Sequence, residues 1–302
     1  MQRRHLLQSL TALPLAGVHS LAASAPQALL QSLKPSVRMP VLFVGHGSPM
    51  NAIEDNAWRR SWQALGQDIL KRAEPQLILC ISAHWLTRGG WQITAMPAPK
   101  TIHDFGGFPQ ELFAQQYPAP GAPQVAVQMA RELRSPSSGQ PLQPDAAEWG
   151  LDHGAWSVLK PMFPQATIPV LQLSMDYSRP PAEHFALGRQ LAALRDRGVL
   201  IVGSGNVVHN LRMVQSDVPD NQAFAWAKEF DAIVAGQIAR GDLGALQKFL
   251  DLGEVARMAH PSHEHYLPLL YAAGAVGAKE MPRFFNAGFQ AASISMRSVQ
   301  WG

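Results

Sequence analysis

Short apolar runs of the kind that form buried strands alternate along this chain with segments of helical periodicity. Such alternation is typical of an α/β fold, in which helices connect the strands of a sheet and cover both of its faces. We therefore predict a single α/β domain with a central mixed, mostly parallel sheet and helices on both faces. The predicted strands are 39–44, 77–82, 168–175, 199–202 and 292–299, and the predicted helices are 56–70, 123–133, 181–197, 223–239, 244–250 and 266–275.

The composition agrees with one globular domain and excludes several other classes of protein. A chain of 302 residues, 47% hydrophobic and 16% charged, can bury a sizeable core and is neither disordered nor a coiled coil. The single cysteine, Cys80, excludes a disulfide framework and a cysteine-based zinc finger. No apolar run is long enough for a transmembrane helix. The net charge of +3 falls to +1 without Arg3 and Arg4, which does not indicate a nucleic-acid partner.

The first 25 residues have the order of a secretory signal. Arg3 and Arg4 precede an apolar stretch at 10–21 and the small residues 22–25. Adjacent arginines before a modestly apolar stretch resemble a twin-arginine signal, which exports folded proteins through dedicated machinery. We therefore predict a signal peptide over 1–25, a linker over 26–38, a folded domain over 39–302, and a periplasmic location. The alternative is an N-terminal extension on a cytoplasmic protein.

Three of the predicted strands are followed by a histidine. His46 follows strand 39–44, His84 follows strand 77–82, and His209 follows strand 199–202. Because ligands of open α/β sheets bind beyond the carboxyl ends of the strands, we expect these side chains to lie at one sheet edge. With eleven histidines and one cysteine in the chain, a transition-metal site would depend on imidazole and carboxylate ligands.

A further histidine cluster, with the sequence HPSHEH, occupies residues 260–265 and opens the predicted helix 266–275. A ligand at the start of a helix would be held rigidly, which makes Glu264 and His265 candidates. The alternative interpretation is a solvated turn.

Two other histidines stand beside a carboxylate. His103 precedes Asp104 in the long loop 98–123, and His153 follows an aspartate. Such pairs can fix a histidine tautomer or form an acid/base couple, and loops of this length usually have a functional role. His184 lies in a regular predicted helix, and we expect it at the helix surface.

Eight segments between residues 39 and 300 carry a resemblance to a known family: VLFVGHGSPMNAIEDN, ISAHW, PKTIHDFGGFP, YPAPG, EWGLDHGAWSVLKPMFP, IPVLQLSMD, GSGNVVHNLR and PSHEHYLPLLYAAGA. They resemble the class III extradiol ring-opening dioxygenases, most closely the 4,5-DOPA-type family. They follow the order and spacing of that family, which makes the resemblance specific. It implies a single α/β domain with a non-haem Fe(II) centre, which zinc often occupies in isolated protein.

The resemblance implies a set of metal-contacting positions. These are His46, His84, His209 and His265. The wider superfamily uses two histidines and one glutamate, so Glu264 is an alternative ligand in place of His209 or His265.

The resemblance also implies His153 as the acid/base residue, with His103 and Asp104 lining the substrate pocket. The implied activity is that of an oxidoreductase that opens a catechol such as 4,5-DOPA and incorporates both atoms of O₂. A ferrous ion in this role needs open coordination positions for the catechol and O₂. A site closed by four histidine ligands would not leave them. The rival interpretations are a zinc-dependent hydrolase that uses the same histidine cluster, and a non-catalytic exported metal-binding protein. Nothing in the sequence indicates an oligomeric state.

Overall fold

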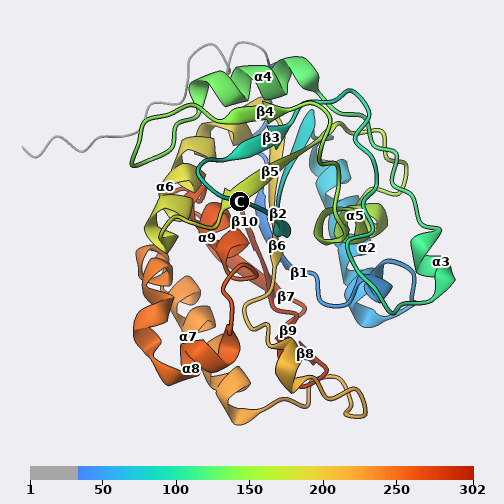
Figure 1. Ribbon diagram of the computed structural model, residues 1–302, viewed down its shortest axis with the longest axis vertical. Helices are drawn as coiled ribbons and strands as arrows, with labels where there is room; N and C mark the ends of the chain where they lie inside the picture. Colours follow the sequence, from blue (N-terminus) through green and yellow to red (C-terminus); the bar gives the residue numbers. More distant parts are fainter. Residues whose placement is uncertain (1–32) are drawn as a thin grey trace, which may run out of the picture.

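The computed structural model describes residues 33–302 (Figure 1). The predicted signal peptide, 1–25, and the first part of the predicted linker lie outside the described residues. Residues 33–38 lie against the domain, where Leu33 is buried and the backbone of Lys34 is hydrogen-bonded to the side chain of Gln76. Among the described residues, no helix is long and apolar enough to cross a membrane.

A mixed eight-stranded sheet forms the centre of the domain, as the sequence predicts. The four strands β5, β2, β6 and β1 are parallel neighbours, and antiparallel pairing occurs between β3 and β5, β1 and β10, and β10 and β7. From one edge to the other the strands are β4 (Gln143–Asp145), β3 (Gln92–Thr94), β5 (Val170–Asp176), β2 (Leu77–Thr87), β6 (Val199–Gly205), β1 (Val41–Gly45), β10 (Ser298–Trp301) and β7 (Pro282–Phe285). A separate two-stranded sheet pairs β8 (Phe289–Gln290) with β9 (Ile294–Ser295).

Helices cover both faces of the sheet, so the central strands are apolar on both sides (Figure 1). Along β1, Leu42 and Val44 pack into the core on one face, and Val41 and Phe43 into the core on the other. The first face is covered by α2 (Ala57–Arg72), α3 (Gln110–Phe113) and α5 (His153–Met162). The second is covered by α4 (Pro123–Glu132), α6 (Pro181–Leu191), α7 (Ala225–Ala239), α8 (Glu254–Ala259) and α9 (Leu267–Gly274).

Shorter 3₁₀ segments connect or extend these elements. The segment η2 continues α6 and ends at Gly198, whose φ of 72° is the left-handed conformation that favours glycine at a helix end. The 3₁₀ segments are η1 (Pro49–Ala52), η2 (Ala192–Arg197), η3 (Leu211–Met213) and η4 (Leu243–Leu252).

The structure differs from the sequence prediction in several elements. The strands β3 and β4 and the helix α5 were not predicted, and the strand predicted over 292–299 is divided between β9 and β10. Nine of the ten residues of α5 are buried, and the helix contains Gly154 and Pro161, two residues that are unfavourable inside a helix, so local propensity argues against a helix there. The strand β2 extends to Thr87, and its pairing with β5 is irregular between Ile81 and Leu86. His84 therefore lies within an irregular part of β2 and not after its end.

The expectation that His184 lies at the helix surface is wrong. Its side chain is buried, with Nδ1 2.8 Å from the hydroxyl of Tyr271, and burial lowers the pKa of His184 to about 4. Positions 184, 187, 188 and 191 have helical spacing and form the buried face of α6. A neutral imidazole with a hydrogen-bond partner is tolerated on such a face.

A buried guanidinium ties together three distant parts of the chain. Arg195 donates to the carbonyl oxygens of Met39 and Ala275 and forms an ion pair with Glu280 at 2.6 Å. Burial alone would raise the pKa of Glu280, but the hydrogen bonds from Arg195 hold it at about 2. The ion pair thus links the chain before β1 with the end of α9 and the turn before β7.

We expect Glu280→Gln to lower the free energy of unfolding at pH 7 by about 3 kcal/mol, because buried Arg195 loses its charged partner. The pKa of Glu280 is lower in the folded state than its ordinary 4.5. Its stabilisation is therefore complete above pH 4.5 and is lost as the pH falls towards 2. Urea unfolding should show a smaller difference between Glu280→Gln and the parent at pH 3 than at pH 7.

The matched control for this prediction is Asp55→Asn, which breaks the exposed ion pair between Asp55 and Arg60. Exposed ion pairs contribute little to the free energy of unfolding, so this variant should be nearly as stable as the parent protein. Equal stability losses in the two variants at pH 7 would contradict the role given to Glu280.

Candidate metal centre and catalytic cleft

A cleft of about 670 Å³ opens where the central parallel strands end. Five histidines from separate parts of the chain line it: His46, His84, His153, His209 and His265. Two of them are positioned by central strands: His46 directly follows β1, and His84 belongs to β2. His153 begins α5, and His265 lies just before α9. The structure therefore brings together the histidines that the sequence places near strand and helix ends.

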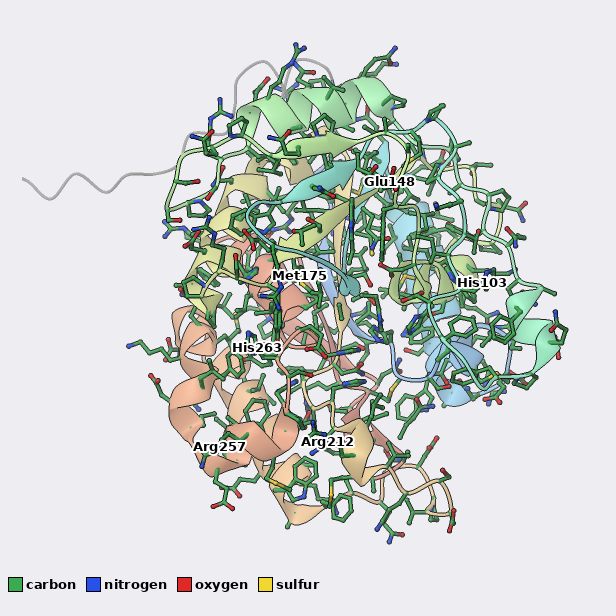
Figure 2. All side chains as sticks on the ribbon, viewed as in Figure 1. His103, Glu148, Met175, Arg212, Arg257 and His263 are labelled. Carbon is green, nitrogen blue, oxygen red and sulfur yellow. The ribbon has the colours of Figure 1, made fainter. Side chains whose placement is uncertain are left out.

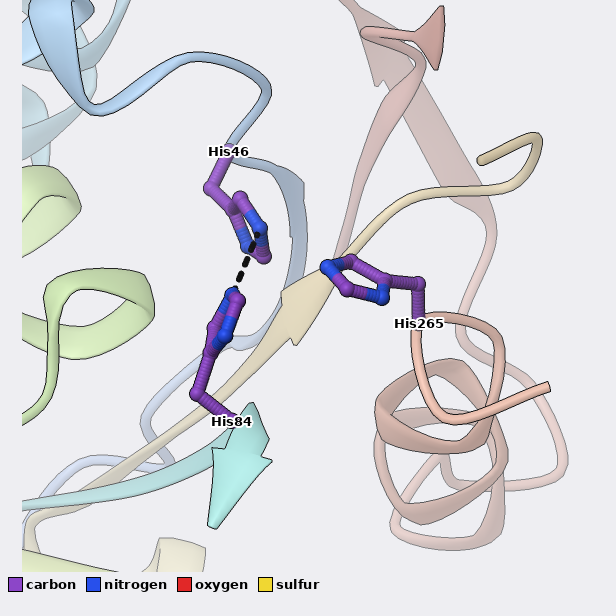
Figure 3. A group of neighbouring side chains, drawn as sticks. All are labelled: His46, His84 and His265. Atoms are coloured by element: carbon purple, nitrogen blue, oxygen red, sulfur yellow. Dashed lines mark hydrogen bonds between the residues drawn. The ribbon is translucent and has the colours of Figure 1, made fainter. Parts of the chain in front are cut away.

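Three of these histidines converge on one point (Figure 3). One ring nitrogen from each of His46, His84 and His265 lies within 4.8 Å of the other two. The Nε2 atoms of His46 and His84 are 3.3 Å apart, and His265 approaches them from the opposite side of the cleft. Together these rings form a three-nitrogen face, which we call the histidine face.

The hydrogen bonds of Ser204 determine which nitrogen of His46 carries a proton. The Ser204 hydroxyl lies 2.5 Å from the carbonyl oxygen of Gly154, which can only accept, so the hydroxyl donates its single proton there. The Nδ1 atom of His46 lies 3.0 Å from Ser204 Oγ and must then be the donor in that contact. His46 consequently presents an unprotonated Nε2 to the histidine face.

A carboxylate lies beside the Nδ1 atom of each of the other two members of the histidine face, as a hydrogen-bond partner of His265 and as a charged neighbour of His84. The Nδ1 atom of His84 lies 3.4 Å from a carboxylate oxygen of Asp104, and the Nδ1 atom of His265 lies 3.1 Å from a carboxylate oxygen of Glu264. An ionised carboxylate only accepts hydrogen bonds, so both contacts favour a proton on Nδ1. Contacts of this kind orient metal-binding histidines in proteins and leave Nε2 free for the metal.

The donor set fits a transition-metal ion. Burial lowers the pKa values of His46, His84 and His265 well below the ordinary value, and mutual repulsion among the histidines adds to the effect. Two unprotonated Nε2 atoms 3.3 Å apart repel each other unless a cation lies between them. Metal–nitrogen bonds of about 2.0–2.1 Å put two adjacent ligand nitrogens roughly 2.9–3.4 Å apart, which matches this separation.

His209 and Glu264 occupy different positions from the histidine face. The ring of His209 stacks on that of His265, with centroids 3.4 Å apart and planes 7° from parallel. Burial lowers the pKa of His209 to about 4. A ligand atom of His209 comes within 4.8 Å of atoms of His265 and Glu264, but the residue does not belong to the group formed by His46 and His84.

Asp104 contacts two histidines at once. One carboxylate oxygen, Oδ2, lies 3.0 Å from Nδ1 of His153 and 3.4 Å from Nδ1 of His84. The other, Oδ1, accepts the backbone N–H of His153 at 2.9 Å. Burial opposes ionisation of Asp104, yet its contacts with His153 lower the carboxyl pKa to about 2. One loop carboxylate therefore connects the histidine face to His153.

The start of α5 fixes the position of His153. Asp152 caps the helix by accepting the backbone N–H of Ala155, and its buried carboxylate also accepts from Ser82 and Gln172. Burial raises the pKa of Asp152 to about 6. Glycine is required at position 154, since a Cβ atom there would collide with Ser82 Oγ. The helix end thus packs directly against β2 beside the histidine face.

Of the two residues that the resemblance predicts to line the substrate pocket, the structure places only one in the cleft. Asp104 lines the cleft, whereas His103 does not. His103 lies beside α5 (Figure 2). Its Nε2 atom is 2.9 Å from the carbonyl oxygen of Gln115, and its ring packs against Phe105 and Trp156. His103 supports Phe105, which itself lines the cleft.

The walls of the cleft are formed by residues that the sequence did not predict. Phe105 and Phe108 come from the long loop, and Leu211, Val214 and Val218 come from the segment between β6 and α7. The hydrophobic side chains of that segment have no periodicity that would distinguish them from loop residues. Phe105 and Phe108 are two aromatic residues in the long loop 98–123, and they are the sequence signal from which part of the apolar wall could have been predicted.

Comparison with known proteins agrees with this arrangement. Residues 40–296 match the family described as the catalytic LigB subunit of aromatic ring-opening dioxygenase. A 4,5-DOPA dioxygenase extradiol of Escherichia coli K12 is 48% identical over 270 residues, which cover 88% of this chain and 96% of the relative. A protein of the same name from Beta vulgaris is 34% identical over 260 residues, or 86% and 95% of the two chains.

A solved structure is also similar. The crystal structure of an uncharacterized protein from Escherichia coli K12 has a TM-score of 0.74 and 42% identity, covering 88% of this chain and 100% of that chain. The Escherichia coli and Beta vulgaris relatives are both dioxygenases, so neither supports the alternative of a zinc-dependent hydrolase. Because the family match spans most of the chain and these relatives are matched over nearly their whole length, the chain belongs to the class III extradiol ring-opening dioxygenases and is an oxidoreductase.

Proposed function

We propose that the protein binds a ferrous ion on the histidine face and opens the ring of a catechol, such as 4,5-DOPA, with O₂. The observation that carries this proposal is the arrangement of His46, His84 and His265, whose Nδ1 atoms each face a protein oxygen while a ring nitrogen of each points to one centre. The names of the Escherichia coli and Beta vulgaris relatives support the substrate class.

Bound there, the ferrous ion would supply open coordination positions for both catechol oxygens and for O₂, since only three protein nitrogens hold it. Zinc suits the same three nitrogens and would occupy the face in isolated protein. In this proposal His209 and Glu264 are not ligands. Glu264 orients His265, and His209 supports the ring of His265 by stacking.

The cleft walls would hold the aromatic ring and exclude water. Phe105 and Phe108 of the long loop, and Leu211 and Val214 of the segment after β6, give the cleft an apolar lining. A flat catechol ring that lies between such walls buries apolar surface, which favours binding and positions its hydroxyl groups at the histidine face.

His153 would act as the acid/base residue. Its Nδ1 atom is held 3.0 Å from Asp104, so Nε2 is the nitrogen available to a substrate in the cleft. From this position Nε2 would take the proton of a catechol hydroxyl and return it later in the reaction. Acid/base help of this kind contributes about 10²–10⁴-fold to a rate.

We further propose that residues 1–25 act as a twin-arginine-like signal that directs the protein to the periplasm. The support is the sequence order of paired arginines, apolar stretch and small residues, together with a family match that begins only at residue 40.

The proposed activity predicts oxygen consumption. Protein reconstituted with Fe(II) under anaerobic conditions and then mixed with oxygenated catechol should take up one O₂ per ring opened. Mass analysis with ¹⁸O₂ should find both labelled atoms in the product. An absence of uptake across a panel of catechols, with ester or amide hydrolysis by the zinc form, would instead favour a hydrolase.

The role of His153 predicts a separation between metal binding and turnover. The variant His153→Ala should retain a full complement of Fe(II), because the histidine face is intact, and lose about 10²–10⁴-fold in kcat. Metal analysis and oxygen uptake on the same preparation measure both quantities. Unchanged kcat in metal-replete His153→Ala protein would remove His153 from the mechanism.

The contacts of Glu264 predict a graded effect on metal affinity. The variant Glu264→Ala should bind Fe(II) about 10–100-fold more weakly, since His265 loses the carboxylate that orients it. His265→Ala should have a larger effect, because it removes a ligand. Competition with a chelator measures the affinities, and Glu254→Ala, at an exposed position on α8, is the matched control. If Glu264→Ala lost metal as completely as His265→Ala, Glu264 would be a ligand itself.

A further inference from the structure

The charged groups that line the cleft are of one sign. The described lining residues include two carboxylates, Asp104 and Asp220, and no lysine or arginine. Asp104 is engaged by His84 and His153. Asp220 accepts one hydrogen bond, from Nε1 of Trp58 at 3.2 Å, and forms no ion pair with any residue in 33–302.

We propose that the cleft selects catechols whose side chain bears an ammonium group over those whose side chain bears a carboxylate, and that Asp220 is the selecting residue. This inference rests on the proposed function, because it specifies the substrate class of the same cleft. It concerns the substituent of the ring and not the chemistry at the histidine face.

The position of Asp220 is determined by its neighbours. Trp58 of α2 holds the carboxylate from one side. The next residue, Asn221, donates its backbone N–H to the carbonyl of Phe289 at 2.9 Å and accepts the backbone N–H of Phe289 on its side chain. Phe289 directly precedes Gln290, another lining residue. Asp220 therefore belongs to a fixed wall of the cleft, although its side chain is exposed to solvent.

The surroundings of Asp220 determine the direction of the selection. The apolar side chains of Val214 and Val218 also line the cleft and offer a bound side chain no opposite charge, while Asp220 stays open to solvent and acts as an exposed charge. An ammonium group would gain the attraction of Asp220. A carboxylate group would lose hydration and find no cationic partner in the lining. Arg212 is exposed beside Leu211 but does not line the cleft.

Three catechols with short side chains of different charge provide the test. They are dopamine, with an ammonium group, 4-ethylcatechol, which is neutral, and 3,4-dihydroxyphenylacetate, with a carboxylate. Binding to the full chain loaded with redox-inert Zn(II) is followed by tryptophan fluorescence, and kcat/KM is measured on the Fe(II) form. We expect dopamine to bind more tightly than the carboxylate compound, and high salt to reduce the difference.

Two variants assign the selection to Asp220. Asp220→Asn removes the charge and keeps an oxygen that can accept from Trp58, and it should lower the ratio of dopamine to 3,4-dihydroxyphenylacetate affinity about threefold to fivefold. The matched control is Asp217→Asn, which removes an equal charge from an exposed residue of the same segment that does not line the cleft. This control should leave the ratio unchanged.

The outcomes distinguish this inference from the proposed function. If 4-ethylcatechol is bound and opened but the ratio is the same in the parent and Asp220→Asn proteins, the selection is absent and the inference alone is overturned. Tighter binding of the carboxylate compound by the parent protein has the same consequence. If none of the three catechols is bound or opened, the proposed function is wrong and the inference falls with it.

Discussion

The parallel arrangement of β5, β2, β6 and β1 is the constraint on which the site depends. Parallel neighbours end at the same sheet edge, so residues at or after their carboxyl ends are brought together although they are far apart in the sequence. The register places Ser204 of β6 opposite Val44 of β1 on one side and Ser82 of β2 on the other. Since side chains alternate between faces, a shift of one residue would turn Ser204 away from His46.

The second determinant is the set of oxygen atoms that hold the Nδ1 positions. Ser204, Asp104 and Glu264 come from a strand, a loop and the approach to a helix, and each contacts a different member of the histidine face. Their contacts direct unprotonated nitrogens at one another in a poorly solvated place, which costs stability in the absence of a cation. Local conflict of this kind is expected at functional sites and is offset by the rest of the fold. Ion binding would relieve the conflict, so the same contacts that orient the rings also favour the metal.

Much of this arrangement could be predicted from sequence, and the remainder has identifiable physical reasons. The apolar runs of β1, β5 and β6 and the position of His46 after a strand predict a histidine-lined sheet edge. The helix α5 contains Gly154 and Pro161, so local propensity argues against a helix there, although Asp152 is a recognisable helix cap. The position of His184 was predicted wrongly for a different reason, which is that a neutral imidazole can occupy a buried helix face. The contacts of Asp104 with two histidines depend on the path of a long loop. That path cannot be predicted from hydrophobic periodicity, because a loop has none.

The central claim is that three Nε2 atoms hold the metal while their Nδ1 atoms are occupied by protein oxygens. A crystal structure of the Fe(II)-loaded protein, with the ion located by anomalous diffraction at the iron edge, tests this claim most directly. The account predicts an ion bonded to Nε2 of His46, His84 and His265, with the remaining positions open to solvent or substrate. An ion bonded instead to His209 or to the carboxylate of Glu264, or a site closed by four histidines, would contradict it.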